Sequence, residues 1–226
     1  MQIFDIKLSC GITTGGLMSK EAQIENILLD EVLKGKLKKG DLLEPERDLA
    51  EKYNCSRPVV HRAIIRLEEK GVLKIRPRKG IQVLDYKMHG RMGLISEVSK
   101  RSKDLLDNKF NKDMLRFIQD NMTNMFMYFE NGKEETCIQF ECAEDYFDIL
   151  LDYSIQTGND LYIMLMNEFR PGIINVGAYC IGHDDINKEF QQIESYLMKG
   201  CVTEAIDTLN ILFGLIEKVW LGGKRV

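Results

Sequence analysis

Two arginines in the first third of the chain have a spacing that suits contact with nucleic acid. Arg57 directly follows Ser56 at the start of an amphipathic helical pattern, and Arg47 lies in a shorter helical pattern before it. The planar fork of an arginine can pair with guanine or with phosphate oxygens. A helix N-terminus also favours phosphate, and Ser56 could both cap the helix and hydrogen-bond a phosphate. These residue types predict a nucleic-acid contact.

Groups typical of catalysis are missing from the sequence. It has no Gly-rich phosphate loop, no nucleophile elbow and no paired-carboxylate motif. The six cysteines form no Cys-x-x-Cys pair and no histidine stands at zinc-finger spacing, which favours reduced structural thiols. The run His183-Asp184-Asp185 could be mistaken for a ligand cluster, but acidic residues suit the first turn of a helix. We therefore expect neither an enzyme nor a cofactor.

Three helical patterns would position the arginines. Ser19 is a plausible N-cap for the first pattern, in which apolar residues recur every three or four positions. Pro45 opens the second helix, over residues 46–52, from the first-turn position where a proline loses no hydrogen bond. The third helix covers residues 57–70 and is expected to be capped by Ser56.

A predicted β-hairpin follows the third helix, which Gly71 ends. Residues 72–76 and 81–84 alternate between apolar and polar types, and the basic turn 77–80 separates them. Helix, helix, turn, helix and hairpin is the order of a winged helix-turn-helix, in which the third helix enters the major groove of DNA. The charged residues of the wing would contact phosphate or the minor groove.

Charge is distributed unevenly along the chain. The net charge is −4, yet residues 46–80 carry ten Lys and Arg against five Asp and Glu, whereas residues 87–226 carry 15 against 22. A basic segment beside an acidic body is typical of a DNA reader joined to a domain that stays off the DNA. No apolar run approaches the about 18 residues of a membrane span, and the first 18 residues make a poor signal peptide. We expect a cytoplasmic location and no membrane partner.

The motif around the arginines resembles the GntR family of bacterial transcription regulators. It comprises Leu42–Tyr53, then Cys55-Ser56-Arg57, then Ala63-Ile64-x-Arg66-Leu67-x-x-x-Gly71. The resemblance implies a DNA-binding winged helix-turn-helix over residues 19–86 that binds a double-stranded operator. The DNA-contacting residues that it implies are Arg47, Ser56, Arg57, Pro58, Val59, His61, Arg62, Arg76, Arg78, Lys79 and Gly80.

The expected recognition helix departs from the family pattern at two positions. His61 stands where the family usually has a second arginine, and Arg62 stands where an acidic residue is common. A histidine can donate one hydrogen bond to a purine acceptor but cannot form a bidentate pair. We therefore expect a reading surface that differs from the family's usual one.

The C-terminal half has the periodicity of helices throughout, after a linker expected at residues 87–94. The expected fold class is therefore mainly α: an N-terminal winged helix-turn-helix with a small β-hairpin, then a C-terminal antiparallel helical bundle. The helical patterns lie near residues 94–107, 111–131, 138–156, 159–180, 184–199 and 201–221.

This half resembles the all-helical effector domain of the FadR subfamily. The resemblance rests on Thr157–Asn167 and on Phe213–Trp220, and it implies an effector-binding and dimerisation domain over residues 95–222. Many relatives hold a metal there through histidines. Because imidazole is the ligand such a site needs, we expect no bound metal. The residues that match those histidines are Asp148, Phe190 and Leu212.

Without a metal, the resemblance points to the branch whose effector is a fatty acyl-CoA, and a small carboxylate is nearly as well supported. The candidate effector contacts are Trp220, Tyr179, Arg170 and Phe213.

The sequence thus predicts a homodimeric regulator on a pseudo-palindromic operator, with an effector in the helical domain that changes DNA affinity. Residues 1–18 would be an N-terminal extension. Two alternatives stay open. One is a ligand-independent DNA-binding protein, and the other is a helical acyl-carrier or metabolite-binding module with a vestigial winged helix.

Overall fold

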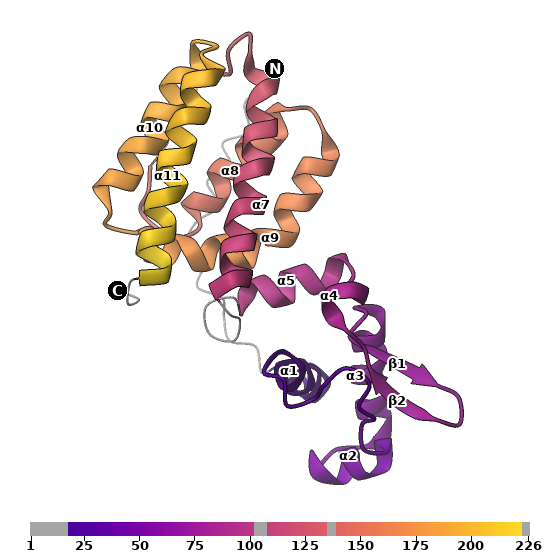
Figure 1. Cartoon of the computed structure of the whole chain (residues 1–226). Coiled ribbons are helices and arrows are strands. Elements are labelled where there is room, and N and C mark those ends of the chain that lie inside the picture. Colours follow the sequence, from indigo (N-terminus) through magenta and orange to yellow (C-terminus); the bar gives the residue numbers. More distant parts are fainter. Residues whose placement is uncertain (1–17, 102–107, 135–138, 223–226) are drawn as a thin grey trace.

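The computed structural model of the chain describes residues 18–101, 108–134 and 139–222. These residues form two lobes, a winged helix-turn-helix and a bundle of longer helices, shown below and above in Figure 1. The mainly helical fold class predicted from the sequence is confirmed. The expected N-terminal extension, residues 1–18, lies outside the described residues apart from Met18.

The smaller lobe has the predicted order of elements. Two of its helix starts differ in detail from the prediction. Pro45 occupies the N-cap of α2 rather than its first turn, and the hydroxyl of Ser56, at the N-cap of α3, makes no capping hydrogen bond. Ser19 does cap α1, because its Oγ accepts the N–H of Ala22 at 3.2 Å. The elements are α1 (Lys20–Leu33), α2 (Glu46–Lys52), α3 (Arg57–Glu69), β1 (Leu73–Arg76) and β2 (Gly80–Val83).

The core of this lobe lies where α1, α3 and the hairpin meet. The inner face of α3 repeats apolar residues every three or four positions, which places them on one side of the helix. These side chains are all fully buried, and so are their partners on α1. The residues are Val60, Ala63, Ile64 and Leu67 on α3, and Ile24, Leu28 and Leu29 on α1.

The wing is a two-stranded antiparallel hairpin. Arg76 pairs with Gly80 at its tip, which leaves a three-residue loop, 77–79, between the strands. Arg78 takes a left-handed backbone with φ of 64°, and Gly80 follows with φ of 102°. A non-glycine residue in this region is strained, so the tip places an arginine where the backbone itself would favour glycine.

The segment expected to be a linker is instead packed onto the winged helix. It contains the short helix α4 (Tyr86–His89) and the start of α5 (Met92–Lys100). A Cβ at Gly71 would lie 1.9 Å from the carbonyl oxygen of His89, so only glycine permits this approach. The N–H of Arg91 also donates to the carbonyl of Lys70 at 3.1 Å. Sequence periodicity does not reveal such a contact, because Gly71 and His89 belong to different elements.

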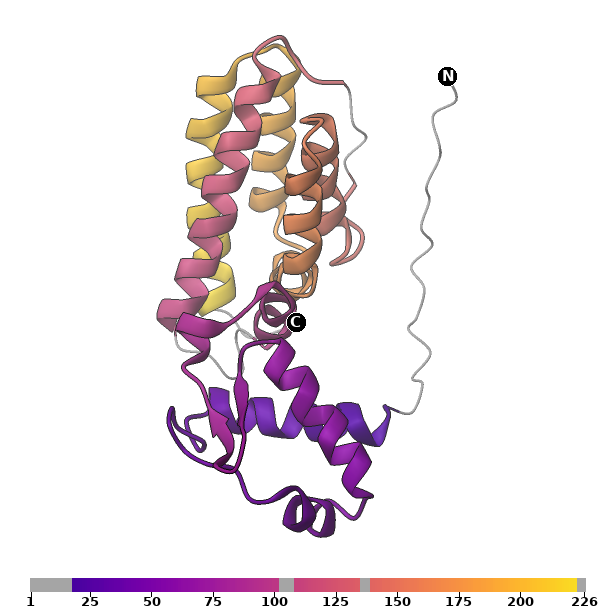
Figure 2. The same cartoon turned by 90° about the vertical axis from the view of Figure 1, so that its right-hand side faces the viewer.

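Helix α5 joins the two lobes. One of its faces places Leu94 and Val98 in the core of the winged helix. Its other face packs against α9 (Asp160–Cys180) of the bundle, where a Cβ added to Gly172 would lie 2.6 Å from the Cβ of Ser99. The absence of a side chain at Gly172 therefore lets the two helices approach closely. Figure 2 shows α5 between the lobes.

The bundle buries a large aromatic and aliphatic core. In Figure 2 its long helices α7 and α11 run side by side. The predicted helix over residues 138–156 begins only at Asp145. The carboxylate of Asp145 accepts the N–H groups of Glu141 and Cys142 at 2.6 and 2.7 Å, which turns the chain before the helix. The remaining elements are α7 (Asn108–Phe126), the 3-10 helix η1 (Met127–Phe129), α8 (Asp145–Gln156), α10 (Asp184–Met198) and α11 (Val202–Gly222).

None of the helices in the described ranges is both long and apolar enough to cross a membrane. The four cysteines within those ranges, Cys55, Cys142, Cys180 and Cys201, are free thiols. Burial raises the pKa of Cys142 to about 11 and that of Cys180 to about 12, so both thiols stay protonated at neutral pH.

Candidate nucleic-acid interface

At the front of α3, Arg57 and His61 both contact Glu46 of α2, and we call these three residues the reading cluster (Glu46, Arg57 and His61). Arg57 and His61 lie one helical turn apart on α3, so they share a face. Glu46 on α2 accepts a hydrogen bond from Nε of Arg57 at 2.9 Å, and its other oxygen lies 2.7 Å from Nδ1 of His61. The Arg57 and His61 side chains are 72% and 52% exposed, whereas that of Glu46 is only 17% exposed.

Glu46 is held in its ionised form by this arrangement. Its partial burial acts to raise its pKa, but the hydrogen bonds from His61 and Arg57 outweigh burial and leave the pKa below the ordinary value. The carboxylate uses only Nε of the Arg57 guanidinium. The remaining N–H groups of this fork are exposed and can reach acceptors on DNA. Glu46 therefore orients Arg57 and His61 without burying them.

The other predicted contacts near the start of α3 differ in exposure. Arg47 on α2 is 83% exposed and pairs with Glu51 one turn later at 3.3 Å. Ser56 and Pro58 are exposed at the first turn of α3. Val59 is half-buried and packs against the core of the winged helix, so much of its side chain serves packing.

Arg62 does not join the reading cluster. It lies five residues after Arg57, which places it on another side of α3. Its Nε pairs with Glu21 of α1 at 2.6 Å, and Arg66 pairs with the second oxygen of Glu21 at 2.9 Å. The structure thus places Arg62 beside α1 rather than beside His61.

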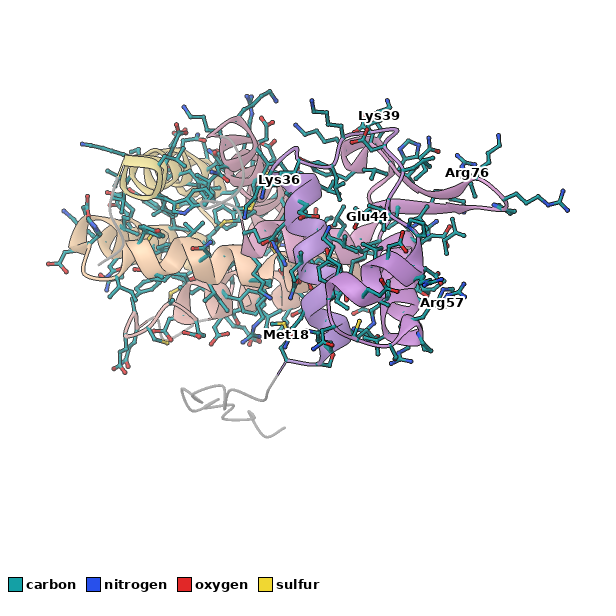
Figure 3. The ribbon with its side chains drawn as sticks, turned by 90° about the horizontal axis from the view of Figure 1, so that it is seen from below. Met18, Lys36, Lys39, Glu44, Arg57 and Arg76 are labelled. Atoms are coloured by element: carbon teal, nitrogen blue, oxygen red, sulfur yellow. The ribbon has the colours of Figure 1, made fainter. Side chains whose placement is uncertain are left out.

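The wing supplies a second group of exposed cations. Arg76, Arg78 and Lys79 are all exposed, and Nε of Arg76 donates to Gln82 across the hairpin at 3.4 Å. Figure 3 shows Arg57 of α3 and Arg76 of β1 on the side of the winged helix that faces away from the bundle. The recognition helix and the wing therefore present arginines on one side of the lobe.

Behind α3 lies an extended ion network, the rear cluster (Glu21, Glu25, Arg62, Arg66, Lys70, Glu97 and Arg101). Its centre is Lys70, whose Nζ lies 2.6 Å from Glu25 of α1 and 3.5 Å from Glu97 of α5. Arg101 extends the network by pairing with Glu97 at 2.6 Å and with Asp30 at 2.7 Å. The rear cluster therefore ties α5 to the body of the winged helix.

The four predicted effector contacts do not surround one cavity. Trp220 is fully buried and Tyr179 nearly so. The guanidinium of Arg170 lies over the ring of Phe147, 4.6 Å from its centroid. Phe213 alone lines the small cavity at the centre of the bundle, which has a volume of about 40 Å³.

The bundle cavity is apolar. Phe190, one of the three residues at which the FadR resemblance led us to expect a metal ligand to be replaced, lines it together with residues such as Ile118 and Leu150. No group of three or more His, Cys, Asp or Glu that could hold a metal ion occurs within residues 18–101, 108–134 and 139–222. Leu212 is buried in the core, and Asp148 is exposed.

Sequence reasoning did not identify Glu46 and Glu21 as site residues. Glu46 stands 11 and 15 positions before its partners on α3, and Glu21 stands 41 positions before Arg62. Such pairings depend on how α1 and α2 pack against α3. The only available signal was the position of Glu46 inside the motif around Arg47.

Comparison with known proteins gives similarity concentrated in the winged helix. Residues 20–83 match the sequence profile of the bacterial regulatory proteins, gntR family. The chain is 38% identical over 63 residues to the Uxu operon transcriptional regulator of Escherichia coli, which covers 28% of this chain and 24% of that protein. It is 34% identical over 85 residues to the HTH-type transcriptional regulator Mce2R of Mycobacterium tuberculosis, which covers 38% and 35%. The chain thus aligns with about a quarter to a third of the length of these relatives.

Two solved structures align with most of the chain at low similarity. Lar, which controls the expression of the Listeria monocytogenes agr system, shares 17% identity over 92% of this chain and 100% of that chain, with a TM-score of 0.49. Streptococcus agalactiae GntR shares 16% identity over 88% and 99%, with a TM-score of 0.37. Similarity at this level does not establish a common arrangement of the two lobes.

The residues that match the family include the residues that form the reading cluster and the wing. The matched range ends at Val83, the last residue of β2, and it contains the whole reading cluster and the whole wing. The matched family and both relatives are regulators and not enzymes. Residues 20–83 are therefore a winged helix-turn-helix domain of the GntR family of bacterial regulatory proteins, and a helical region follows them.

Proposed function

We propose that the whole chain is a transcription regulator that reads a specific DNA operator through the front of α3. The observation that carries this proposal is the reading cluster, in which Glu46 orients two exposed side chains on the recognition helix. A guanidinium and an imidazole at the first turns of such a helix are placed to donate to base edges in the major groove. Arg57 would pair with guanine or phosphate, and His61 would donate one hydrogen bond to a purine.

The wing and the flanking residues would fix the position of the domain on the duplex. Arg76, Arg78 and Lys79 are exposed, and cations of this kind neutralise phosphates or enter the minor groove. Arg47 would contact the backbone beside the groove, together with the exposed first turn of α3. The remaining predicted contacts are assigned smaller roles: Ser56, Pro58, Val59, Arg62 and Gly80. Arg62 has the weakest geometric support, because Glu21 holds it.

We also propose that the regulator acts as a homodimer. One recognition helix contacts only a few base pairs, and two-fold symmetry lets a second copy read a second half-site one helical turn away. Native mass spectrometry of the full chain checks this point directly, with a dimer as the expected species and a monomer at micromolar concentration as the contrary result.

An effector held by the helical region would complete the regulator, with a fatty acyl-CoA or a small carboxylate as the class that sequence resemblance favours. The cavity at the centre of the bundle has a volume of about 40 Å³, close to the space that a single water occupies. An acyl-CoA would require the bundle to open widely. This small volume favours, as second candidate, a protein that binds DNA without an effector in the bundle interior.

Operator binding tests the main proposal. Genomic fragments selected by the purified chain should bind with an affinity at least about 1,000-fold above that for random duplex at physiological salt. Fluorescence anisotropy with the selected and the scrambled sequence measures the ratio. Equal affinity for the two sequences contradicts a specific regulator. The same dimer analysed by native mass spectrometry reports a co-purified ligand by its added mass.

A further inference from the structure

A large groove lies between the two lobes, outside the reading cluster and the bundle interior. We call it the connector groove, because α4 and α5 form one wall and α7 forms the other. Its volume is about 780 Å³, within the range of about 300–1,000 Å³ usual for small-molecule sites. Phe169 of α9 closes one side. The groove is thus far larger than the cavity inside the bundle.

The floor of the connector groove is apolar and aromatic. Leu94 and Val98 of α5 contribute buried side chains, and Met114 does so from α7. Phe117 lies against Phe169, with ring centroids 5.3 Å apart, yet 44% of Phe117 stays exposed. Exposed aromatic surface in a concave site indicates a ligand with an apolar part.

The rim of the connector groove is positively charged. Lys87, Arg91 and Lys109 line it, with Asp113 as the one acidic residue of the described lining. Lys109 and Asp113 form an ion pair at 2.6 Å, so their charges offset each other. Arg91 uses one terminal nitrogen on the carbonyl of Glu69 at 3.4 Å, and its charge also acts on the carboxylate of Glu68, so it is only partly offset. Two cationic heads, Lys87 and Arg91, therefore stand above an apolar floor.

We propose that the connector groove binds a medium-chain aliphatic carboxylate. The carboxylate would pair with Arg91 and Lys87, and the chain would lie over Phe117 and Leu94. A guanidinium matches a carboxylate through two parallel N–H bonds, and the apolar floor gains from removing the chain from water. An uncharged ligand would bring no anion to Lys87 and Arg91, and a purely polar anion would leave Phe117 in water.

The position of the connector groove would allow a bound ligand to alter how the two lobes are arranged. One wall belongs to the segment that packs on Gly71 and the rear cluster, and the other wall belongs to the bundle. A ligand that contacts both walls stabilises one relative arrangement of the lobes. This regulatory role rests on the proposed function, whereas binding in the groove does not.

Decanoate is the probe for this proposal. Isothermal titration of the full chain should give saturable binding with a Kd of about 0.1 mM. The double variant Lys87→Gln, Arg91→Gln should weaken binding at least about tenfold, whereas Lys188→Gln, an exposed cation on α10, should leave it unchanged. Phe117→Glu should also weaken binding at least about tenfold, and Ile211→Glu, at another exposed apolar residue on α11, should not. Decanol should bind the double variant and the unaltered chain equally.

Three results would overturn the proposal: no saturation up to about 2 mM decanoate, equal loss in the control variants, or conversion of a dimer into a monomer by Phe117→Glu. The last result would assign the connector groove to a second copy of the chain. Circular dichroism checks that each variant is folded. Operator affinity is then measured with and without decanoate. Decanoate binding without specific DNA binding would retain the site and reject the proposed function, and the reverse result would reject only the site.

Discussion

The two sides of α3 use the same kinds of side chain under different degrees of burial. In front, Glu46 contacts Arg57 and His61, and most of both partners stays exposed. Behind, Glu25 contacts Lys70, whose side chain is only 21% exposed. Exposed pairs contribute little to stability because water screens them, whereas removing one member of a buried pair leaves a costly charge. Arg57 and His61 at the front are therefore free to form hydrogen bonds with DNA. The ion pairs at the rear are suited to stabilise the domain.

The largest effect should follow from removal of the central cation of the rear cluster. Lys70→Ala removes the shared partner of Glu25 and Glu97, which keep Arg66 and Arg101 as partners, and we expect a loss of about 2 kcal/mol in the free energy of unfolding. Urea denaturation at pH 7 measures it. Lys52→Ala, which removes a more exposed pair with Glu44, is the matched control and should cost less than about 1 kcal/mol. Equal losses would remove the distinction between the two sides of α3.

The front of α3 should behave in the opposite way. Arg57→Ala should weaken operator binding by about 1–3 kcal/mol, which is roughly fivefold to more than a hundredfold in affinity, and should change the free energy of unfolding by less than about 0.5 kcal/mol. Anisotropy and urea denaturation on the same preparation measure the two quantities. Arg116→Ala, an exposed arginine on α7, should alter neither. A large stability loss in Arg57→Ala would make Arg57 a structural residue.

The wing tip allows stability and DNA binding to be separated at one position. Arg78→Gly removes a charge and also relieves the left-handed backbone at φ of 64°, whereas Arg78→Ala removes only the charge. Both variants should bind DNA more weakly. The salt dependence of their DNA binding should fall by the amount expected for the loss of about one phosphate contact. The glycine variant should be more stable than the alanine variant by about 1 kcal/mol. Equal stability would mean that the loop relaxes around Arg78.

The smallest effect concerns acid. Burial of Glu97 acts to raise its pKa, but the hydrogen bond from Arg101 and the charge of Lys70 leave the pKa below the ordinary 4.5. A lowered carboxyl pKa adds stability that is present above the ordinary pKa and lost as the pH falls through the lowered value. The unaltered chain should lose stability between about pH 5 and 3, and Glu97→Gln should reduce that acid-dependent loss by less than about 1 kcal/mol. Glu217→Gln, at a surface pair with Lys112, is the control for urea denaturation at both pH values.

The sequence predicts best where a signal acts within a few residues. Gly71 ends α3, and the basic turn joins two alternating stretches, because helix ends and tight turns depend on local backbone geometry. The late start of α8 was missed because a carboxylate of Asp145 binds the backbone before it. A capping contact of this kind has several possible sequence patterns, and helical periodicity alone extends through it.

The site was predictable only in part, because most of its contacts join residues that are far apart in the sequence. Arg57 and His61 could be placed on one face from their spacing along a helix. The pairing of Arg62 with Glu21 could not, because it depends on the packing of α1 against α3 across 41 positions. The four candidate effector contacts lie on α9 and α11, and only Phe213 of the four lines the bundle cavity, which depends on how these helices pack against the rest of the bundle. The segment 87–94 was misread because two glycines and several polar residues are common in linkers and also in close backbone contacts.

The contact between Gly71 and His89 bears on where this winged helix could be joined to another protein. The match to the family's sequence profile ends at residue 83, but the folded unit continues through α5, whose Leu94 and Val98 complete the core. In a chimera joined at residue 84, the winged helix of another protein would have to pack against α4 and α5 of this one, whose residues fit a different surface. A joint placed after Arg101, whose side chain pairs with Asp30 and Glu97, would carry the complete unit. In this protein, the end of the family match and the end of the folded unit are separated by two helices, α4 and α5.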